Sequence, residues 1–220
     1  MVAAVIFDVG GVLVESPFVA ALRWQQQMEL PNETLRVFFE EYAKVPEPGE
    51  EPPAWHRVEM GTLSVQSFLD DVRPKIRGLV PDDHIVFSVS AADFNVFENA
   101  GAHWEMIHAV RRCRERGLAT AILTNNVKEW GAWRDVVSLD DFDVVVDSCE
   151  VGMRKPDPAI WRHTLDRLGV APEQAAFLDD HPANVAAADQ MGMTGIMVTA
   201  DIAAAVAEVD ALGLGGEAST

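Results

Sequence analysis

Five short runs of apolar residues recur along the chain. They cover residues 2–7, 118–123, 142–146, 175–178 and 195–198. Continuous runs of this kind are typical of strands that are buried on both faces of a parallel sheet. Segments with a helical pattern alternate with the later runs, at about 103–116, 127–138, 157–168, 182–191 and 201–212. This alternation predicts an α/β fold whose parallel strands are joined by right-handed crossovers.

The segment between the first two runs has a different pattern. Helices are predicted at about 17–29, 32–44 and 64–78, a loop rich in proline and acid at 46–53, and a helix rather than a strand at 82–95. Ser16 and Pro17 favour the start of the first helix, as N-cap and first helical residue. We therefore predict a core formed by residues 1–14 and 99–212, an all-helical insertion at 15–98, and a disordered tail at 213–220.

The composition is that of a soluble globular protein, with 49% hydrophobic and 24% charged residues. A formal net charge of −18 argues against nucleic acid or an anionic membrane as a partner. No apolar run approaches the ~20 residues that span a bilayer, and the N-terminus lacks the basic region of a signal peptide. Cys113 and Cys149 lack the spacing of metal ligands. We expect a cytoplasmic protein with reduced thiols, either a monomer or a homodimer.

Polar side chains follow three of the apolar runs, at the points where the strands end. Asp8 follows the first run, Thr124 the second, and Asp179 and Asp180 the fourth. Carboxyl ends of parallel strands lie at one edge of a sheet, so we expect these side chains to converge on one crevice. Carboxylates packed together raise one another's pKa unless a cation compensates them. Mg²⁺ suits such a site, since it binds carboxylates together with a substrate phosphate.

Two neighbouring features fit a site for an anionic ligand. Gly10 and Gly11, just after Asp8, permit a tight turn and the close approach of a ligand to the backbone. Lys155 lies in a loop framed by two prolines, residues 154–158. It is a candidate counter-charge for Asp8 and for a phosphoryl group.

Each of these residues could also have a purely structural role. Asp8 could end an ordinary strand, Thr124 or Asp179 could cap a helix, and Lys155 could be a solvated surface residue. The combination of all four in this order on successive strand ends is much harder to explain as an accident, and it favours a catalytic site.

Four segments together resemble the motifs of the haloacid dehalogenase-like (HAD) hydrolases. They are residues 7–13 (FDVGGVL), 123–126 (LTNN), 154–158 (RKPDP) and 177–185 (FLDDHPANV). The resemblance covers residues 2–200, and the insertion resembles the family's type 1 cap. Within the family the chain is most similar to the branch of the N-terminal phosphatase domain of soluble epoxide hydrolase and certain sugar-phosphate phosphatases. This implies a Rossmann-like core and a Mg²⁺-dependent hydrolase of a small phosphorylated metabolite, such as a sugar phosphate.

The resemblance also implies roles for individual residues. Asp8 would be the nucleophile and form an aspartyl-phosphate that water then hydrolyses. Asp180 would bind Mg²⁺ directly, and Asp179 directly or through water. Thr124 and the amide of Asn125, at a helix N-terminus, would hold phosphate oxygens.

The resemblance also implies roles for Lys155, for the loop after the first strand and for the insertion. Lys155 would offset negative charge on Asp8 and on the transferring group, and the carbonyl of Gly10 can face the metal. The loop that contains Gly11 would line the entrance together with the cap. Candidates for selecting the leaving group are Arg23, Trp24, His56 and Arg57.

The sequence departs from the family pattern at Gly10. Most phosphatases of the family carry a second aspartate there, which serves as general acid and base, a function typically worth about 10²–10⁴-fold. Three consequences stay open. The substrate has a good leaving group, such as a sugar 1-phosphate or an acyl phosphate; or His56, Glu59 or His181 supplies the proton; or the chain binds phosphorylated ligands without turning them over.

Two other functions compete with a phosphatase. A 2-haloacid dehalogenase would also use Asp8 but needs no metal. Dehalogenases of the family place an aromatic residue at the position of Gly10 and lack paired acids in the form of Asp179 and Asp180. A non-catalytic protein that binds phosphorylated ligands would explain Gly10, but not why the other motifs are intact.

Overall fold

A five-stranded parallel sheet forms the centre of the molecule, with the strand order β3-β2-β1-β4-β5. The computed structural model describes residues 1–40, 42, 44, 46, 49–95 and 99–212. The strands are β1 (Ala4–Phe7), β2 (Ala119–Thr124), β3 (Val144–Asp147), β4 (Ala175–Asp179) and β5 (Thr194–Met197). The predicted α/β class with a Rossmann-like parallel sheet is confirmed. The tail that we expect to be disordered, residues 213–220, lies outside the described residues.

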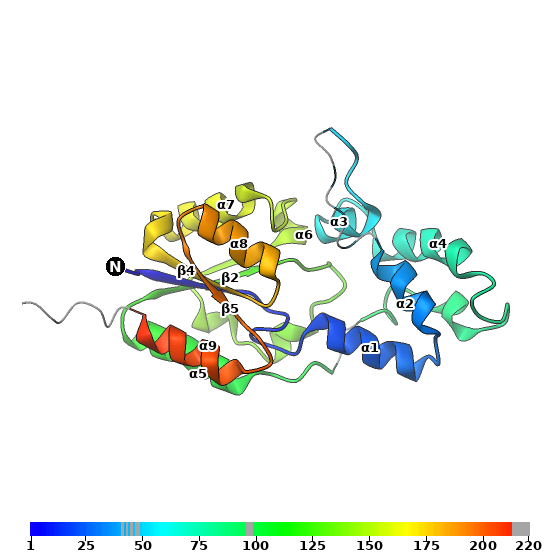
Figure 1. Cartoon of the computed structure of the whole chain (residues 1–220), viewed down its shortest axis with the longest axis horizontal. Coiled ribbons are helices and arrows are strands. Elements are labelled where there is room, and N and C mark those ends of the chain that lie inside the picture. Colours follow the sequence, from blue (N-terminus) through cyan, green and yellow to red (C-terminus); the bar gives the residue numbers. More distant parts are fainter. Residues whose placement is uncertain (41, 43, 45, 47–48, 96–98, 213–220) are drawn as a thin grey trace, which may run out of the picture.

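Helices cover both faces of this sheet (Figure 1). They are α5 (Trp104–Glu115) and α9 (Ile202–Ala211) on one face, and α7 (Pro158–Leu168) and α8 (Pro182–Gln190) on the other. Side chains of the central strand alternate between the two layers, as a pleated strand requires. Val5 and Phe7 join the same buried cluster as residues of α5 and α9, whereas Ile6 joins the cluster of α7 and α8. Burial on both faces explains why the first apolar run is continuous.

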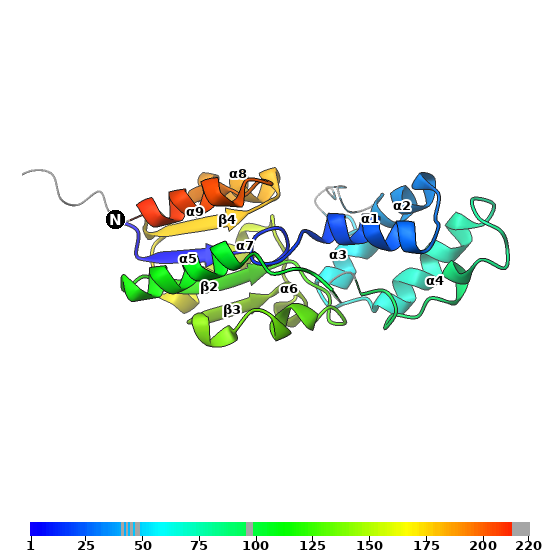
Figure 2. The ribbon, with the colours of Figure 1, turned by 90° about the horizontal axis from the view of Figure 1, so that it is seen from below.

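The described residues between β1 and α5 form helices and turns, without a strand. The helices are α1 (Pro17–Gln27), α2 (Asn32–Phe39), α3 (Ala54–Glu59) and α4 (Val65–Ile76). Aromatic rings fill the centre of this helical insertion, where the ring centroid of Phe94 lies 5.2 Å from that of Trp24 and 5.7 Å from that of Phe38. Figure 2 shows the insertion beyond the edge of the sheet toward which the strands point. It therefore lies over the carboxyl ends of the strands.

Two segments predicted as helical each contain only one short 3-10 helix. In 127–138 the regular structure is a 3-10 helix, Ala132–Asp135. Trp133 within it and Trp130 just before it are buried, and the Trp130 indole donates to the Phe94 carbonyl at 2.6 Å. These contacts with the insertion override the helical pattern. In 82–95, where we favoured a helix over a strand, the regular structure is the 3-10 helix Ile85–Ser88, and no strand is present.

Short elements are the other difference between expectation and structure. The helix expected at 32–44 ends at Phe39 in α2, and neither α3 nor α6 (Ser148–Val151) was predicted. Both unpredicted helices have only one or two turns, too few for a periodic pattern to stand out. No helix in the described part of the chain is long and apolar enough to cross a membrane.

Candidate active site

Three carboxylates meet at the carboxyl edge of the sheet, because β1 lies between β2 and β4. Asp8 directly follows β1, Asp179 is the last residue of β4, and Asp180 comes next. One oxygen atom from each of the three lies within 4.8 Å of the others. The strand order thus brings together acids that are about 170 residues apart in the chain.

Lys155 lies among these carboxylates and is buried, with only 1% of its side chain exposed. Its Nζ is 2.9 Å from Asp8 Oδ1, 2.7 Å from Asp179 Oδ2, and 3.1 Å from the Leu123 carbonyl oxygen. Burial alone would lower the pKa of this ammonium, but the charges of Asp179 and Asp8 raise it above its usual value. Lys155 is therefore a charged, internal partner of the acids rather than a solvated surface lysine.

The cluster carries an excess of negative charge. Burial raises the pKa of Asp8 to about 7; the charges of Asp179 and Asp180 act in the same direction, and Lys155 opposes them. Burial, together with the charge of Asp179, also raises the pKa of Asp180. Three carboxylates against one ammonium form a site in which a further cation would be stabilised.

Asp179, at the end of β4, and Asp180, which follows it, have different hydrogen-bond partners. Asp179 accepts hydrogen bonds from the backbone N–H of His181 at 2.8 Å and from Asn184 Nδ2, which lies 3.1 Å from each carboxylate oxygen. Asp180 Oδ2 accepts a hydrogen bond from the Ser16 hydroxyl at 3.1 Å. Ser16 has the predicted N-cap position of α1, but its side chain makes no capping hydrogen bond. Its hydroxyl orients Asp180 instead.

The two glycines after Asp8 allow the loop to lie against Asp180. Gly11 has a φ of +77°, and a Cβ atom there would lie 2.0 Å from Asp180 Oδ2. A side chain at Gly11 would therefore displace one of the acids. Gly10 lines the pocket described below and brings no side chain that could carry a proton.

Thr124 and Asn125 lie at the end of β2 and line the same pocket. Asn125 donates from Nδ2 to the Lys155 carbonyl at 2.9 Å and accepts the Lys155 N–H at 2.8 Å. Its side chain thus connects the loop after β2 with the loop that contains Lys155. The expectation that its amide begins a helix was wrong, because no α-helix follows. The next amide, of Asn126, donates to Ser148 Oγ.

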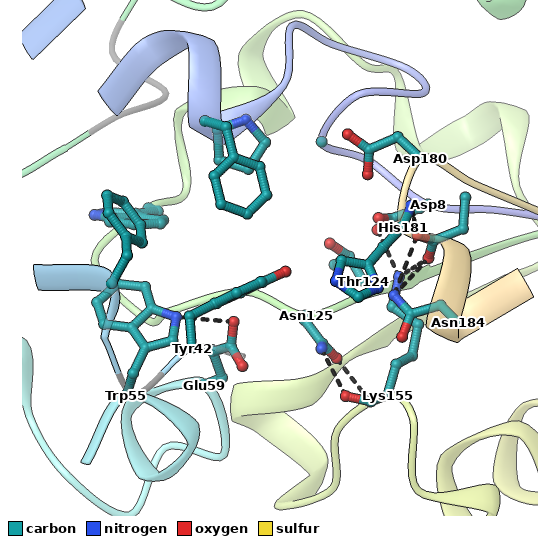
Figure 3. Close-up of a pocket in the computed structure, with 16 residues that line it drawn as sticks. Asp8, Tyr42, Trp55, Glu59, Thr124, Asn125, Lys155, Asp180, His181 and Asn184 are labelled. Carbon is teal, nitrogen blue, oxygen red and sulfur yellow. Dashed lines mark hydrogen bonds and ion pairs between the residues drawn. The ribbon is translucent and has the colours of Figure 1, made fainter. Parts of the chain in front are cut away.

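A pocket of about 50 Å³ separates the acids from the helical insertion (Figure 3). Its core side includes Asp8, Gly10, Thr124, Asn125, Lys155, Asp179, Asp180, His181 and Asn184. Its other side is mainly aromatic and includes Pro17, Phe18, Phe39, Tyr42, Trp55, Glu59 and Trp130. The charged groups that could act on a phosphoryl group therefore face rings that could contact the rest of a substrate.

Glu59 is the one acid on the insertion side of the described pocket lining. Its carboxylate accepts hydrogen bonds from Trp55 Nε1 at 3.0 Å and from Arg154 Nε at 2.7 Å. Arg154 directly precedes Lys155, so this ion pair links α3 to the lysine loop. Glu59 is 4% exposed, and the two bonds fix the position of its carboxyl group.

Tyr42 is a pocket residue that the sequence analysis did not identify. Its ring points across the pocket in Figure 3, and burial together with the charge of Glu59 raises its pKa, so the phenol stays neutral. No motif surrounds it in the sequence, and it lies three residues beyond the end of α2, at a position that we predicted to be helical. Asn184 was noted only as part of a motif, without a role; the structure gives it the contact with Asp179.

The candidates for selecting the leaving group lie away from the acids. His56 lines a neighbouring pocket of about 410 Å³, and its Nε2 lies 2.9 Å from the Tyr42 carbonyl. Arg57 is ion-paired with Glu51, and Arg23 with Glu15. Trp24 packs against Phe38 and Phe94 in the centre of the insertion. None of the four is among the described residues that line the acidic pocket.

Comparison with known proteins agrees with this architecture. The model of the family "haloacid dehalogenase-like hydrolase" matches residues 2–192. Acyl-CoA dehydrogenase family member 10 of Mus musculus is 34% identical over 215 residues, which are 95% of this chain and 19% of that protein. Bifunctional epoxide hydrolase 2 of Sus scrofa is 27% identical over 206 residues (89% and 36%). Phosphoserine phosphatase of Thermus thermophilus is 45% identical over 71 residues (31% and 28%).

Solved structures of the same fold include enzymes with different reported ligands. A HAD-family enzyme of Bacteroides thetaiotaomicron in complex with magnesium and inorganic phosphate has a TM-score of 0.61 at 17% identity, over 91% of this chain and 96% of that one. L-2-haloacid dehalogenase of Xanthobacter autotrophicus has a TM-score of 0.58 at 20% identity (93% and 81%).

The chain spans less than two fifths of the length of each of these three curated relatives. The family match, by contrast, extends over most of the chain and includes all the acids of the site. The resemblance predicted from the four motifs is thus confirmed, and with it the assignment as an enzyme. The chain belongs to the haloacid dehalogenase-like hydrolases.

Proposed function

We propose that this hydrolase releases phosphate from phosphomonoesters of small organic metabolites, with Asp8 as nucleophile and Mg²⁺ as cofactor. The observation that carries the proposal is the buried cluster of three carboxylates around Lys155. An apolar or neutral substrate would gain little from so much charge, whereas a phosphoryl group needs both a cation and an ammonium beside it. The similarity to a phosphoserine phosphatase and the fold shared with a magnesium- and phosphate-bound enzyme support this choice.

The residues present fit a magnesium ion. Oxygen atoms are the ligands that Mg²⁺ prefers. Burial, together with the charges of Asp179 and Asp180, raises the pKa of Asp8, and a cation beside it would stabilise its carboxylate form. Asp8, Asp180 and the carbonyl of Gly10 would hold it. Asp179 already accepts hydrogen bonds from three donors, so it would act through water and by orienting Lys155. When bound, Mg²⁺ would neutralise part of the negative charge of the phosphoryl group.

The chain's own residues would then divide the reaction into two steps. A carboxylate oxygen of Asp8 attacks phosphorus, and the bond from phosphorus to the leaving-group oxygen breaks. Lys155 stabilises negative charge on Asp8 and on the transferring group, and the Thr124 hydroxyl donates to a phosphate oxygen. Water then attacks the aspartyl-phosphate, which releases inorganic phosphate and restores Asp8.

Proton donation to the leaving group is the step for which the site is least equipped. Two of the three candidate donors are engaged elsewhere: Glu59 is ion-paired with Arg154, and His56 faces the Tyr42 carbonyl. Gly10 offers no acid. The third candidate, His181, lines the pocket, and its buried Nδ1 has no hydrogen-bond partner among the described residues, so it is the one of the three that remains available. A leaving group that departs with little protonation suits such a site best.

A dehalogenase is the second candidate, since a 2-haloacid dehalogenase shares the fold and would use the same nucleophile. Displacement of halide requires no metal, so it would not use the excess negative charge of the acid cluster. No specific feature of the site favours it.

The test is phosphate release from a panel of phosphate esters and acetyl phosphate, with Mg²⁺ and then with EDTA. We expect turnover that EDTA abolishes and that restored Mg²⁺ recovers. Halide release from 2-haloacids, measured in parallel with EDTA present, covers the second candidate. Halide release without phosphate release would overturn the proposal in favour of the dehalogenase.

A further inference from the structure

Aromatic rings with available surface lie opposite the acid cluster. Five aromatic residues line the insertion side of the pocket, namely Phe18, Phe39, Tyr42, Trp55 and Trp130. Trp55 and Trp130 are buried, at 3% and 5% exposure. Phe18 is 39% exposed, and Phe39 and Tyr42 are half-buried, so these three rings can still gain contacts with a ligand.

The three available rings form a row that reaches the acids. The centroid of Phe18 lies 5.8 Å from that of Phe39 and 5.2 Å from that of Tyr42, the latter pair edge to face at 88°. Tyr42 in turn lies 6.0 Å from the ring of His181, which directly follows Asp180. A ligand group that leaves the acid cluster on this side therefore meets aromatic surface.

The acidic pocket is large enough for only part of a substrate. About 50 Å³ has room for roughly four water-sized groups, which matches a phosphoryl group and little more. The neighbouring pocket of about 410 Å³ shares Tyr42, Asn125, His181 and Asn184 with it. Its volume is that of an ordinary small-molecule site. A leaving group that extends into this larger pocket therefore passes Tyr42. Phe18, whose ring contacts that of Tyr42, lines the small pocket but not the larger one.

The chemistry of the leaving group is restricted independently of this geometry. Because Gly10 carries no acid, a leaving-group oxygen that His181 does not protonate departs as an anion. A phenol has a pKa of about 10, whereas an alkyl hydroxyl resembles water at about 16, so an aryl oxide leaves far more easily. Edge-to-face contacts with an aromatic ring add about 0.5–1.5 kcal/mol beyond its burial.

We propose that the substrates are aryl phosphates, monoesters of aromatic hydroxyl compounds, whose ring packs against Phe18 and Tyr42; this rests on the proposed phosphatase function. Asp8 forms a bond to phosphorus while the bond from phosphorus to the aryl oxygen breaks. The aryl oxide keeps the electron pair and takes a proton from solvent after release. Water then cleaves the aspartyl-phosphate to give inorganic phosphate.

The first test separates ring recognition from leaving-group acidity. kcat/KM is measured for phenyl phosphate, for the phosphate of a polyfluorinated alcohol as acidic as phenol, and for an unactivated alkyl phosphate. We expect the aryl ester to exceed the fluorinated ester, and the alkyl ester to be slowest. Equal values for the aryl and fluorinated esters would overturn ring recognition. Equal values for all three would show that a proton donor exists.

The second test uses Phe18→Leu and, on the same helix, Leu22→Ala as matched control. Leu22 is 50% exposed and lines an outer groove of the insertion rather than the acidic pocket. We expect Phe18→Leu to lower the ratio of phenyl phosphate to acetyl phosphate activity about 2- to 10-fold, and Leu22→Ala to leave that ratio unchanged. An unchanged ratio in Phe18→Leu, or an equal fall in both variants, would overturn the inference.

Failure of the inference and failure of the proposed function have different signatures. If acetyl phosphate is hydrolysed with Mg²⁺ but aryl esters have no advantage, only the substrate class is wrong. If no phosphate compound is hydrolysed, the phosphatase function and this inference are overturned together.

Discussion

The ammonium of Lys155 lies 2.9 Å from the carboxylate of Asp8, and both groups are removed from solvent. The pair joins a loop after β3 to the end of β1, so it can form only in the folded chain. Since the same ammonium also contacts Asp179, a single lysine compensates two of the three carboxylates of the site.

Replacing this lysine should destabilise the fold. Lys155→Met leaves buried carboxylates without their partner, and we expect the free energy of unfolding to fall by about 3–5 kcal/mol. Urea denaturation of the metal-free protein measures it. Lys128→Met is the control, because Lys128 is exposed and its replacement should cost less than about 0.5 kcal/mol. A loss no larger than that of the control would show that the lysine does not compensate the acids.

The raised pKa of Asp8 should make the metal-free protein sensitive to pH. In the folded state this pKa is about 7, against an ordinary value of 3.8, so the folded chain binds more protons than the unfolded chain between these values. The contribution of Asp8 to stability therefore decreases as pH rises through that window. Asp8→Asn removes this penalty, and its stability gain over wild type should grow from pH 4 to 7, by up to about 4 kcal/mol.

Thermal unfolding of both proteins in EDTA across this pH range measures the difference. A gain that stays constant with pH would mean that Asp8 has an ordinary pKa in the folded protein. Lowering of the pH itself affects both proteins equally, so only their difference reports on Asp8.

Gly11 should be required for the metal site rather than for folding alone. Gly11→Ala places a Cβ atom 2.0 Å from Asp180 Oδ2, in a backbone with φ of +77°. Gly117→Ala is the matched control, because its φ is +78° and nothing lies within 4 Å. Both should lose about 1–2 kcal/mol of stability from backbone strain. Only Gly11→Ala should also lose the rise in melting temperature that Mg²⁺ gives the wild type; retention of that rise would contradict the role given to Asp180.

The sequence contains enough information for the sheet and the acids, because both depend on local patterns. Each strand is a continuous apolar run, and Asp8 and Asp179 are recognisable as residues at strand ends. Lys155 was expected as a counter-charge for Asp8, and the structure shows that contact. Its contact with Asp179 depends on the strand order, which the sequence analysis did not predict.

Other features depend on contacts between distant segments and could not be predicted. The turns around Trp130 exist because its indole reaches the Phe94 carbonyl in the insertion. Tyr42 lines the pocket, yet no motif marks it in the sequence, and the helix predicted at 32–44 assigned it no role. Ser16 has the sequence signature of an N-cap, yet its hydroxyl binds Asp180, 164 residues away.

The central claim is that Asp8 becomes phosphorylated during turnover, and mass spectrometry of the acid-quenched enzyme tests it most directly. The protein is mixed with Mg²⁺ and phenyl or acetyl phosphate, quenched within the first turnover, and digested. We expect one phosphoryl group on the peptide that contains Asp8, removable by hydroxylamine and missing in Asp8→Asn. Steady phosphate release by Asp8→Asn, or a phosphoryl group on another residue, would contradict the mechanism.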